Sequence, residues 1–200
     1  MASIPNHKIC FETIKIKNGK LQNLKYHQQR VNSTREFLGF KNQLDLNTLP
    51  IERLNGVLRV DYAENILSVT YRDLKEREFR EFVVVKSDIE YGYKYANRDE
   101  LDSLKVAERE IIIVKNGLLT DTTIANIALH VEDVWLTPKT ALLRGTTRER
   151  LIDSGFLKCE DLTIKDLKKS KNFAIMNALI DFKVIKRANI DLGFNTVIQK

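Results

Sequence analysis

The chain has 200 residues, of which 43% are hydrophobic, so it can bury the core of one large domain or of two small ones. Eight glycines and three prolines leave little room for disordered linkers, and no apolar run is long enough for a membrane-spanning helix. The net charge of +6 suits a nucleic-acid binder or an enzyme for anionic ligands.

The positions of the charged residues, and of the residue types that can bind metals, reduce the number of protein classes to consider. Lysine and arginine alternate with acidic residues, which predicts a solvated surface and no nucleic-acid partner. The two cysteines and three histidines have no metal-ligand spacing, so we expect no metal site. Because no signal peptide is recognisable, a soluble, cytoplasmic protein is expected.

The first part of the chain, residues 1–88, is predicted to form an α+β subdomain. Aromatic and β-branched residues predict a strand at Ile9–Lys17, and Asn18-Gly19 is a hairpin signal that returns the chain along Lys20–Leu24. Polar, helix-forming residues predict a helix at Tyr26–Phe37. The remaining predicted elements are a short helix at Asp45–Leu54 and strands at Gly56–Tyr62, Asn65–Arg72 and Arg80–Lys86.

The second part, residues 89–200, begins after an expected boundary near Ser87–Glu90. Its predicted elements are a β-like segment at Tyr91–Tyr95, a helix at Arg98–Arg109, strands at Glu110–Lys115 and Leu118–Thr122, a hairpin of Ile124–Glu132 with Val134–Thr137, a helix at Thr147–Ser154 and final strands within Asn172–Lys186. The predicted fold class is therefore α/β of the α+β type, with two intimate subdomains of mixed sheet plus helices.

The segment LLRGTTRERL places a Gly-Thr-Thr turn at the start of the predicted helix. Free backbone N–H groups, two hydroxyls and the positive end of the helix dipole make such a turn a phosphate site. The alternative is ordinary capping of the helix by Thr146, with Glu149 three residues on. Both interpretations of the turn stay open.

Asp121 lies in a predicted returning strand among mostly apolar neighbours, where a carboxylate is costly unless it is paired. A protonated pyridine nitrogen would be a suitable partner, whereas the alternative is an Asp side chain that caps its own turn with Thr122 and Thr123. The ligand that needs both a phosphate grip and a ring-nitrogen partner is pyridoxal phosphate.

Lys94 stands between Tyr93 and Tyr95. A lysine packed among aromatic rings loses hydration, so its pKa falls and its amine becomes a usable nucleophile. The alternative is a surface lysine, or a cation–π contact with one of the two tyrosines.

In this order, the motifs resemble the class IV aminotransferases, which are fold-type-IV pyridoxal-phosphate enzymes. The resemblance covers nearly the whole chain and rests on CFETIKIKNGKLQNLKYHQQRV, YKYANR, TDTTIANI, LLRGTTRERL and IMNALIDFKVI. It implies the fold of D-amino acid aminotransferase and a homodimer. The pattern at Lys94–Arg98 and the motif Asn177–Leu179 are more similar to the 4-amino-4-deoxychorismate lyase branch than to branched-chain aminotransferases.

The resemblance also implies the roles of individual residues. Lys94 would form the covalent link to the cofactor and act as the proton-shuttling base, and Asp121 would pair with the ring nitrogen. The remaining implied cofactor contacts are Arg30, Thr146 and Thr147 to the phosphate, and Arg98 beside the phenolic oxygen. Asn126 would support the hairpin. The family more often has Glu at the position of Asp121, and its members usually carry a further Gly-rich segment before the FETI run, which bears on substrate recognition.

The function that the resemblance implies is a lyase that eliminates pyruvate from 4-amino-4-deoxychorismate and leaves 4-aminobenzoate, a folate precursor. The first alternative is an aminotransferase for a small D-amino acid or a branched L-amino acid, because the same residues serve both reactions. The second is a non-catalytic relative with the same fold. In each enzymatic case, the partner is a small-molecule amine.

Overall fold

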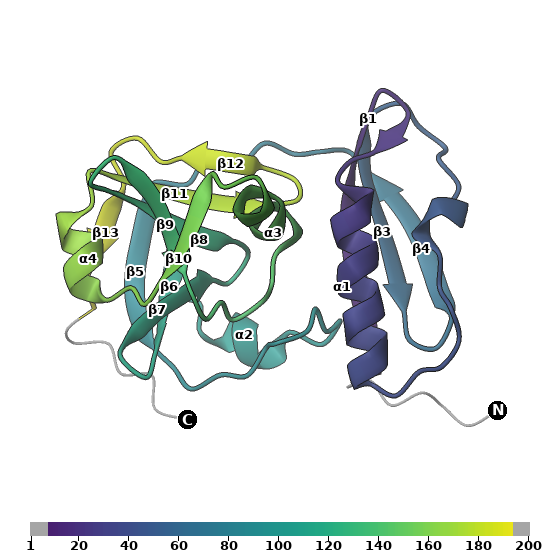
Figure 1. The fold of residues 1–200 in the computed structure, drawn as a ribbon, viewed down its shortest axis with the longest axis horizontal. Helices are drawn as coiled ribbons and strands as arrows, with labels where there is room; N and C mark the ends of the chain where they lie inside the picture. The colour runs from purple at the N-terminus through teal and green to yellow at the C-terminus, as the bar shows by residue number, and fades with distance from the viewer. Residues whose placement is uncertain (1–7, 194–200) are drawn as a thin grey trace. The chain divides into compact units, whose positions relative to one another are not determined.

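The computed structural model describes residues 8–193, which form two compact units (Figure 1). The first unit contains the chain up to Glu76 and the segment Tyr93–Arg98, and the second contains Arg77–Gly92 and the chain from Asp99 onward. The mixture of sheets and helices confirms the predicted fold class. No helix within residues 8–193 combines the length and apolar character needed to span a membrane.

The first unit is a four-stranded antiparallel sheet covered by one helix. Its elements are β1 (Cys10–Lys17), β2 (Lys20–Leu21), α1 (Leu24–Phe37), the short 3-10 helix η2 (Leu46–Thr48), β3 (Gly56–Tyr62) and β4 (Ile66–Arg72). The strand order is β2-β1-β3-β4. Figure 1 shows α1 lying alongside this sheet, and the core between them includes Ile14, Val31 and Leu58. The predicted hairpin, helix and strands of this region are confirmed.

The predicted helix at Asp45–Leu54 is wrong, because only its first turn forms, as η2. Leu49 is extended, with φ −65° and ψ 133°. Its neighbour Pro50 explains the difference, since the proline ring disfavours helical geometry in the preceding residue. Leu46 and Leu49 are buried in the core of the unit, but Ile51 and Leu54, which the helix was expected to bury together with Leu49, are exposed.

The segment Tyr93–Arg98 pairs with the beginning of β1 without forming a regular strand. Phe11 N–H donates to the Lys94 carbonyl at 2.9 Å, and Ala96 N–H donates to the carbonyl of Ile9 at 2.8 Å. The β-like stretch predicted at Tyr91–Tyr95 is therefore reduced to an isolated bridge between Cys10 and Tyr95. These bonds fix the backbone of Lys94 against β1.

The second unit is a larger mixed sheet with short helices at its borders. Its elements are β5 (Glu81–Lys86), α2 (Asp99–Ser103), β6 (Glu110–Lys115), β7 (Leu118–Thr122), β8 (Asn126–Val131), β9 (Val134–Pro138), α3 (Thr146–Asp153), β10 (Leu157–Glu160), α4 (Ile164–Lys169), β11 (Asn172–Asn177), β12 (Asp181–Val184) and β13 (Asn189–Asp191). The strand order is β10-β9-β8-β7-β6-β5-β13, with β11 pairing β8 and β12.

Two features of this unit differ from the sequence prediction. The helix expected at Arg98–Arg109 is wrong beyond α2, because Ala107 has a φ of 49° and a bridge joins Val106 to Arg109. The strand β5 was expected in the first subdomain, but its parallel pairing with β6 places it in the second unit. The units thus follow strand pairing rather than chain order.

The junction between β7 and β8 positions the most polar residues of the second unit. The two strands are joined by one residue pair, Asp121 with Asn126. Beyond this pair, β8 continues into pairing with β9 and β11. Asp121 and Asn126 therefore lie where one part of the sheet gives way to the next.

Candidate functional site

In the first unit, a buried carboxylate organises the polar residues between β1 and α1. Glu12 is fully buried and accepts hydrogen bonds from Arg30 Nε at 2.7 Å and Arg30 Nη2 at 2.6 Å. Its Oε2 also lies 2.5 Å from Nδ1 of His27. Burial alone would raise the pKa of Glu12, but the charge of Arg30 and the contact with His27 outweigh it and lower the pKa to about 2.

Lys94 belongs to the same cluster. Its Nζ lies 4.6 Å from the centre of the Phe11 ring, over which the Arg59 guanidinium also lies, at 4.0 Å. Burial, together with the positive charge of Arg30, lowers the pKa of Lys94 to about 7, although Glu12 opposes this shift. Arg98 and Arg59 lower it further. The predicted loss of hydration thus occurs, and the cation–π partner is Phe11.

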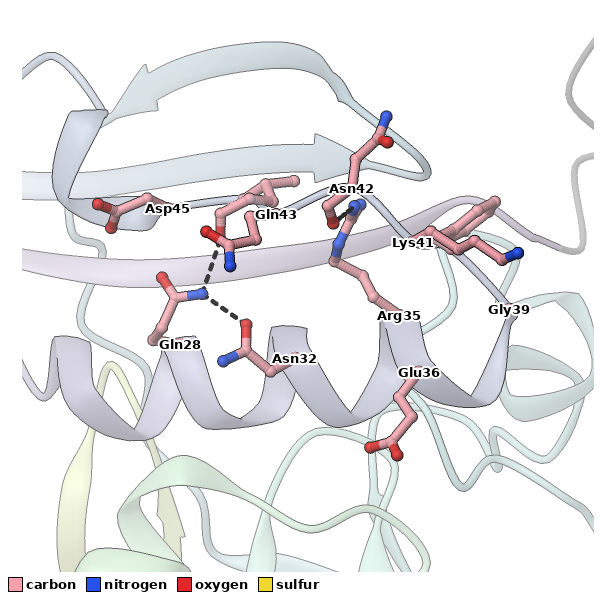
Figure 2. A pocket seen from close by; sticks show the side chains of 11 residues that line it. Gln28, Asn32, Arg35, Glu36, Gly39, Lys41, Asn42, Gln43 and Asp45 are labelled. Atoms are coloured by element: carbon pink, nitrogen blue, oxygen red, sulfur yellow. Dashed lines mark hydrogen bonds between the residues drawn. The ribbon is translucent and has the colours of Figure 1, made fainter.

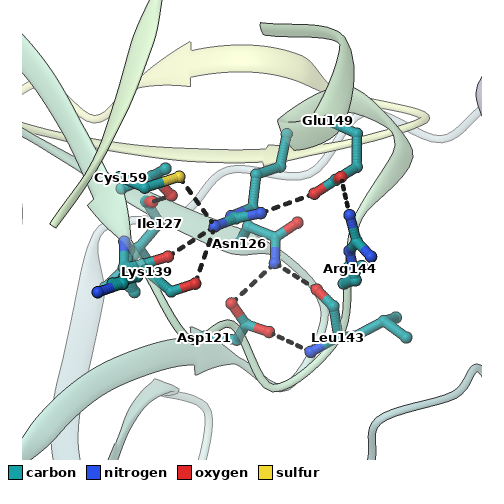
Figure 3. Close-up of polar contacts among 11 residues, drawn as sticks. Asp121, Asn126, Ile127, Lys139, Leu143, Arg144, Glu149 and Cys159 are labelled. Carbon is teal, nitrogen blue, oxygen red and sulfur yellow. Dashed lines mark hydrogen bonds and ion pairs between the residues drawn. The ribbon is translucent and has the colours of Figure 1, made fainter. Parts of the chain in front are cut away.

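In the second unit, Asp121 is buried and held by two neutral donors (Figure 3). Asn126 Nδ2 donates to its Oδ1 at 2.8 Å, and the Leu143 backbone N–H donates to its Oδ2 at 2.7 Å. Burial raises the pKa of Asp121 to about 6, because these two donors only partly replace the lost hydration. The alternative in which Asp121 caps its own turn is wrong, since Thr122 Oγ1 bonds the turn at Ile124 and Ala125 instead.

Asn126 ties this carboxylate to the loop before α3. Its Nδ2 also donates to the Leu143 carbonyl at 2.8 Å. Its Oδ1 lies so close to Gly145 that a Cβ on that glycine would be 1.9 Å away. Gly145 has an ordinary φ of −73°, so glycine is needed here for close packing rather than for backbone conformation. The residues at the β7–β8 junction and the loop therefore form one packed group.

The start of α3 carries two buried hydroxyls that lack a partner. Gly145, and not Thr146 as predicted, is the N-cap residue, so the helix begins with Thr146 and Thr147. The hydroxyl oxygens of both threonines are buried and have no hydrogen-bond partner among the described residues. Buried polar atoms are rarely left unsatisfied, and these lie at the positive end of a helix. A phosphate would satisfy them, so the residues fit that group.

Arg148 supports the beginning of the same helix. It is buried, and its Nη2 donates to the Pro138 carbonyl at 2.7 Å while its Nη1 donates to Glu149 at 2.7 Å. Glu149 also accepts from Arg144 at 2.7 Å. These contacts fasten α3 to the end of β9 and fix the direction in which its N-terminus points.

The residues predicted for the cofactor thus fall into two groups, each described within its own unit. The first unit holds Arg30, Lys94 and Arg98, and the second holds Asp121, Thr146 and Thr147. Sequence reasoning missed Glu12 and His27. A signal for Glu12 was present, because the period of two in β1 places it on the same buried face as the core residues of that strand.

A separate groove of about 650 Å³ lies beside α1 and is lined by Gln28, Asn32, Arg35, Glu36 and residues 39–45 (Figure 2). Several of its polar side chains are engaged internally. Gln28 Nε2 donates to Asn32 and to the Leu44 carbonyl, and Arg35 donates to carbonyls that include that of Asn42. None of the predicted cofactor residues lines this groove.

Comparison with known proteins identifies the family of the chain. The family model Amino-transferase class IV matches residues 92–187. An uncharacterized protein of Haemophilus influenzae is 35% identical over 182 residues, which cover 84% of this chain and 96% of that protein. The chain therefore belongs to the class IV amino-transferase family.

Two solved structures share the fold. A crystal structure of a candidate 4-amino-4-deoxychorismate lyase from Haemophilus somnus has a TM-score of 0.76 and 27% identity, covering 86% of this chain and 96% of that one. A hypothetical aminotransferase from Mycobacterium tuberculosis, in its PLP-bound form, has a TM-score of 0.76 and 15% identity, covering 92% of this chain and 82% of that one. The second likeness speaks for the fold alone.

Proposed function

We propose that this protein is a pyridoxal-phosphate enzyme that converts 4-amino-4-deoxychorismate to 4-aminobenzoate and pyruvate. The observation that supports this cofactor is the pair of unpartnered hydroxyls of Thr146 and Thr147 at the start of α3, which follows a loop packed against the buried carboxylate of Asp121. The lyase reaction is favoured by the likeness to the Haemophilus somnus protein, which covers nearly all of that chain.

When bound, the cofactor would supply an electron sink for the carbanion formed at the amine-bearing carbon of the substrate. Asp121 would face the protonated ring nitrogen and keep it protonated. The hydroxyls of Thr146 and Thr147 would donate hydrogen bonds to the phosphate, and the family resemblance assigns to Arg30 charge-assisted hydrogen bonds to the same group. Arg98 would lie beside the phenolic oxygen.

Lys94 has two roles in this proposal. Its amine is a nucleophile for the cofactor aldehyde, because a pKa of about 7 leaves a large fraction unprotonated at neutral pH. Its Nζ then removes the proton from the substrate carbon that bears the amine, since a base is most effective with a pKa near the working pH. The enolpyruvyl group would then leave the neighbouring carbon with the electrons of its C–O bond, take up a proton and become pyruvate, and the ring would become aromatic.

The second candidate is an aminotransferase, favoured by the match of residues 92–187 to the Amino-transferase class IV family model. In that case Lys94 would return the proton to the cofactor carbon and no elimination would occur. A non-catalytic relative of the family is the third candidate, and it predicts no turnover of either substrate.

The first test is cofactor binding and attachment. We expect added pyridoxal phosphate to produce a visible absorbance band and borohydride reduction to place the label on the peptide that contains Lys94. The Lys94→Ala variant should bind the cofactor without the covalent label. A label on another lysine would contradict the assignment, and the absence of binding would overturn both enzymatic candidates.

The second test identifies the reaction. The loaded protein is incubated with 4-amino-4-deoxychorismate, and 4-aminobenzoate and pyruvate are measured. Equal amounts of both products support the lyase. If D-alanine or a branched L-amino acid instead bleaches the visible band and releases the matching keto acid, the aminotransferase is the correct function.

A further inference from the structure

Glu12 holds Arg30 through two hydrogen bonds that run side by side. The donors are Nε and Nη2 on one edge of the guanidinium, and each bonds a different oxygen of the carboxylate, at 2.7 and 2.6 Å. A bidentate pair of this kind fixes both the position and the plane of a guanidinium group. Arg30 is also largely shielded, with 10% of its side chain exposed, so the arrangement is not a loose surface contact.

Glu12 is itself held independently of Arg30. His27 lies three residues before Arg30, one turn earlier on α1, and its Nδ1 is 2.5 Å from Oε2 of Glu12. Glu12 is ionised, because its pKa is about 2, so the imidazole must donate its Nδ1 proton. The carboxylate is therefore anchored by the backbone of β1 and by a second residue of α1.

Glu12 has two opposite effects on any phosphate that Arg30 binds. It offsets part of the positive charge of Arg30, which weakens attraction at a distance. It also engages two of the five donors of the guanidinium and holds the group in one orientation, which lowers the ordering cost of hydrogen bonds from the planar group to an anion. The geometry favours the second effect, because the directional bonds of a fixed planar group are lost as soon as it rotates.

We propose that Glu12 is a positioning residue that holds Arg30 for the phosphate and thereby makes the protein select the phosphorylated cofactor over its unphosphorylated form. The inference rests on the proposed function, since it concerns the same cofactor, but it assigns a residue that acts through Arg30 rather than by contact with the ligand. His27 belongs to the same device because it fixes Glu12.

The test measures a ratio of two dissociation constants, for pyridoxal and for pyridoxal 5′-phosphate, by absorbance titration of the full chain. This ratio reports the contribution of the phosphate alone, because the aldehyde and the ring are common to both ligands. In Glu12→Gln, a charge-assisted bidentate contact becomes a weaker one, and we expect the ratio to fall about tenfold. A merely structural defect would weaken both ligands alike and leave the ratio unchanged.

A second variant covers the case in which Glu12→Gln does not fold, since removing one partner of a buried pair is strongly destabilising. Arg30→Lys keeps a positive charge opposite Glu12 but lacks the planar group that Glu12 orients. We expect this variant to retain the fold, measured by near-ultraviolet circular dichroism, and to lose the preference for the phosphorylated form. Retention of that preference in Arg30→Lys would overturn the inference.

The matched control is Asp61→Asn. Asp61 accepts from Arg59 Nε at 3.0 Å and Nη2 at 2.6 Å, so it forms another two-donor pair in the same unit without contact to Arg30. Its ratio should equal that of the wild type. A folded Glu12→Gln protein with an unchanged ratio overturns the inference alone, whereas a wild-type protein that binds neither ligand overturns the proposed function and the inference with it.

Discussion

Glu12 and Asp121 are both buried carboxylates, yet their environments shift the two pKa values in opposite directions. Glu12 faces the cation Arg30, and its pKa is lowered to about 2. Asp121 receives hydrogen bonds from the neutral donors Asn126 and Leu143, and burial outweighs these bonds and the charge of Arg148, so that its pKa is raised to about 6. A buried carboxylate without an ion-paired cation is costly to the fold, so Asp121 is the one that a positively charged ligand would stabilise.

The raised pKa of Asp121 predicts a specific dependence of stability on pH. Between pH 3.8 and about 6, the folded protein retains a proton at Asp121 that the unfolded chain has released. The free energy of unfolding therefore falls as pH rises through this window, by about 3 kcal/mol in total. Urea denaturation gives the unfolding free energies of the wild type and of Asp121→Asn at each pH. The difference between the two values should change across this window, because the other titrating groups are common to both proteins.

The direction of that change is decisive. The variant should gain stability relative to the wild type as pH rises from below 3.8 to above 6, and the difference should stay constant at higher pH. A difference that does not vary with pH would contradict the raised pKa. Glu12 contributes in the opposite sense in both proteins, since its stabilisation is lost as pH falls from 4.5 toward about 2.

At the scale of elements, the start of α3 is set by packing rather than by a capping side chain. Gly145 is the N-cap and supplies no side-chain hydrogen bond. The Asn126 side chain from β8 occupies the space that a Cβ of residue 145 would need. The loop and the β7–β8 junction are consequently packed together as one group, which explains how short elements can hold Thr146 and Asp121 in a fixed relation.

Gly145→Ala is predicted to destabilise the protein by about 1–3 kcal/mol, because its Cβ would force Asn126 out of place. The same substitution should cost clearly less in the Asn126→Ala background, where the clashing oxygen is absent. A double-mutant cycle of unfolding free energies measures this coupling. Equal penalties in both backgrounds would show that the close approach does not decide the residue at position 145.

On the scale of the whole molecule, strand pairing divides the chain into two units differently from a single cut along the chain. The core of the first unit contains residues of β1, α1 and β3, and a separate core in the second unit includes Ile112, Ile127 and Ile175. A single boundary near Ser87–Glu90 would put β5 in the first unit and Tyr95 in the second. The parallel pairing of β5 with β6 instead places β5 in the second unit, and the bridge between Cys10 and Tyr95 places Tyr95 in the first.

The family resemblance predicts a homodimer. An interface would cover apolar side chains that are exposed on the single chain, among them Phe37, Leu54 and Phe156. Light scattering during size-exclusion chromatography should therefore give twice the chain mass of 23.2 kDa at micromolar concentration. A mass of one chain at all concentrations would contradict the prediction.

The sequence by itself determined most of the element types and the family, and it predicted six cofactor residues, because hydrophobic period, turn residues and motif order are local properties. It determined neither the end of the helix after Asp45 nor the N-cap of α3, since one depends on a proline neighbour and the other on a side chain from another strand.

Only the tertiary structure revealed what surrounds each charge. The pairing of Glu12 with Arg30 and His27 joins residues of a strand and a helix, and the two donors to Asp121 come from β8 and from the loop before α3. Whether a buried carboxylate is hydrogen-bonded by a cation or by neutral donors decides the direction of its pKa shift, and those donors are brought together by folding rather than by sequence separation.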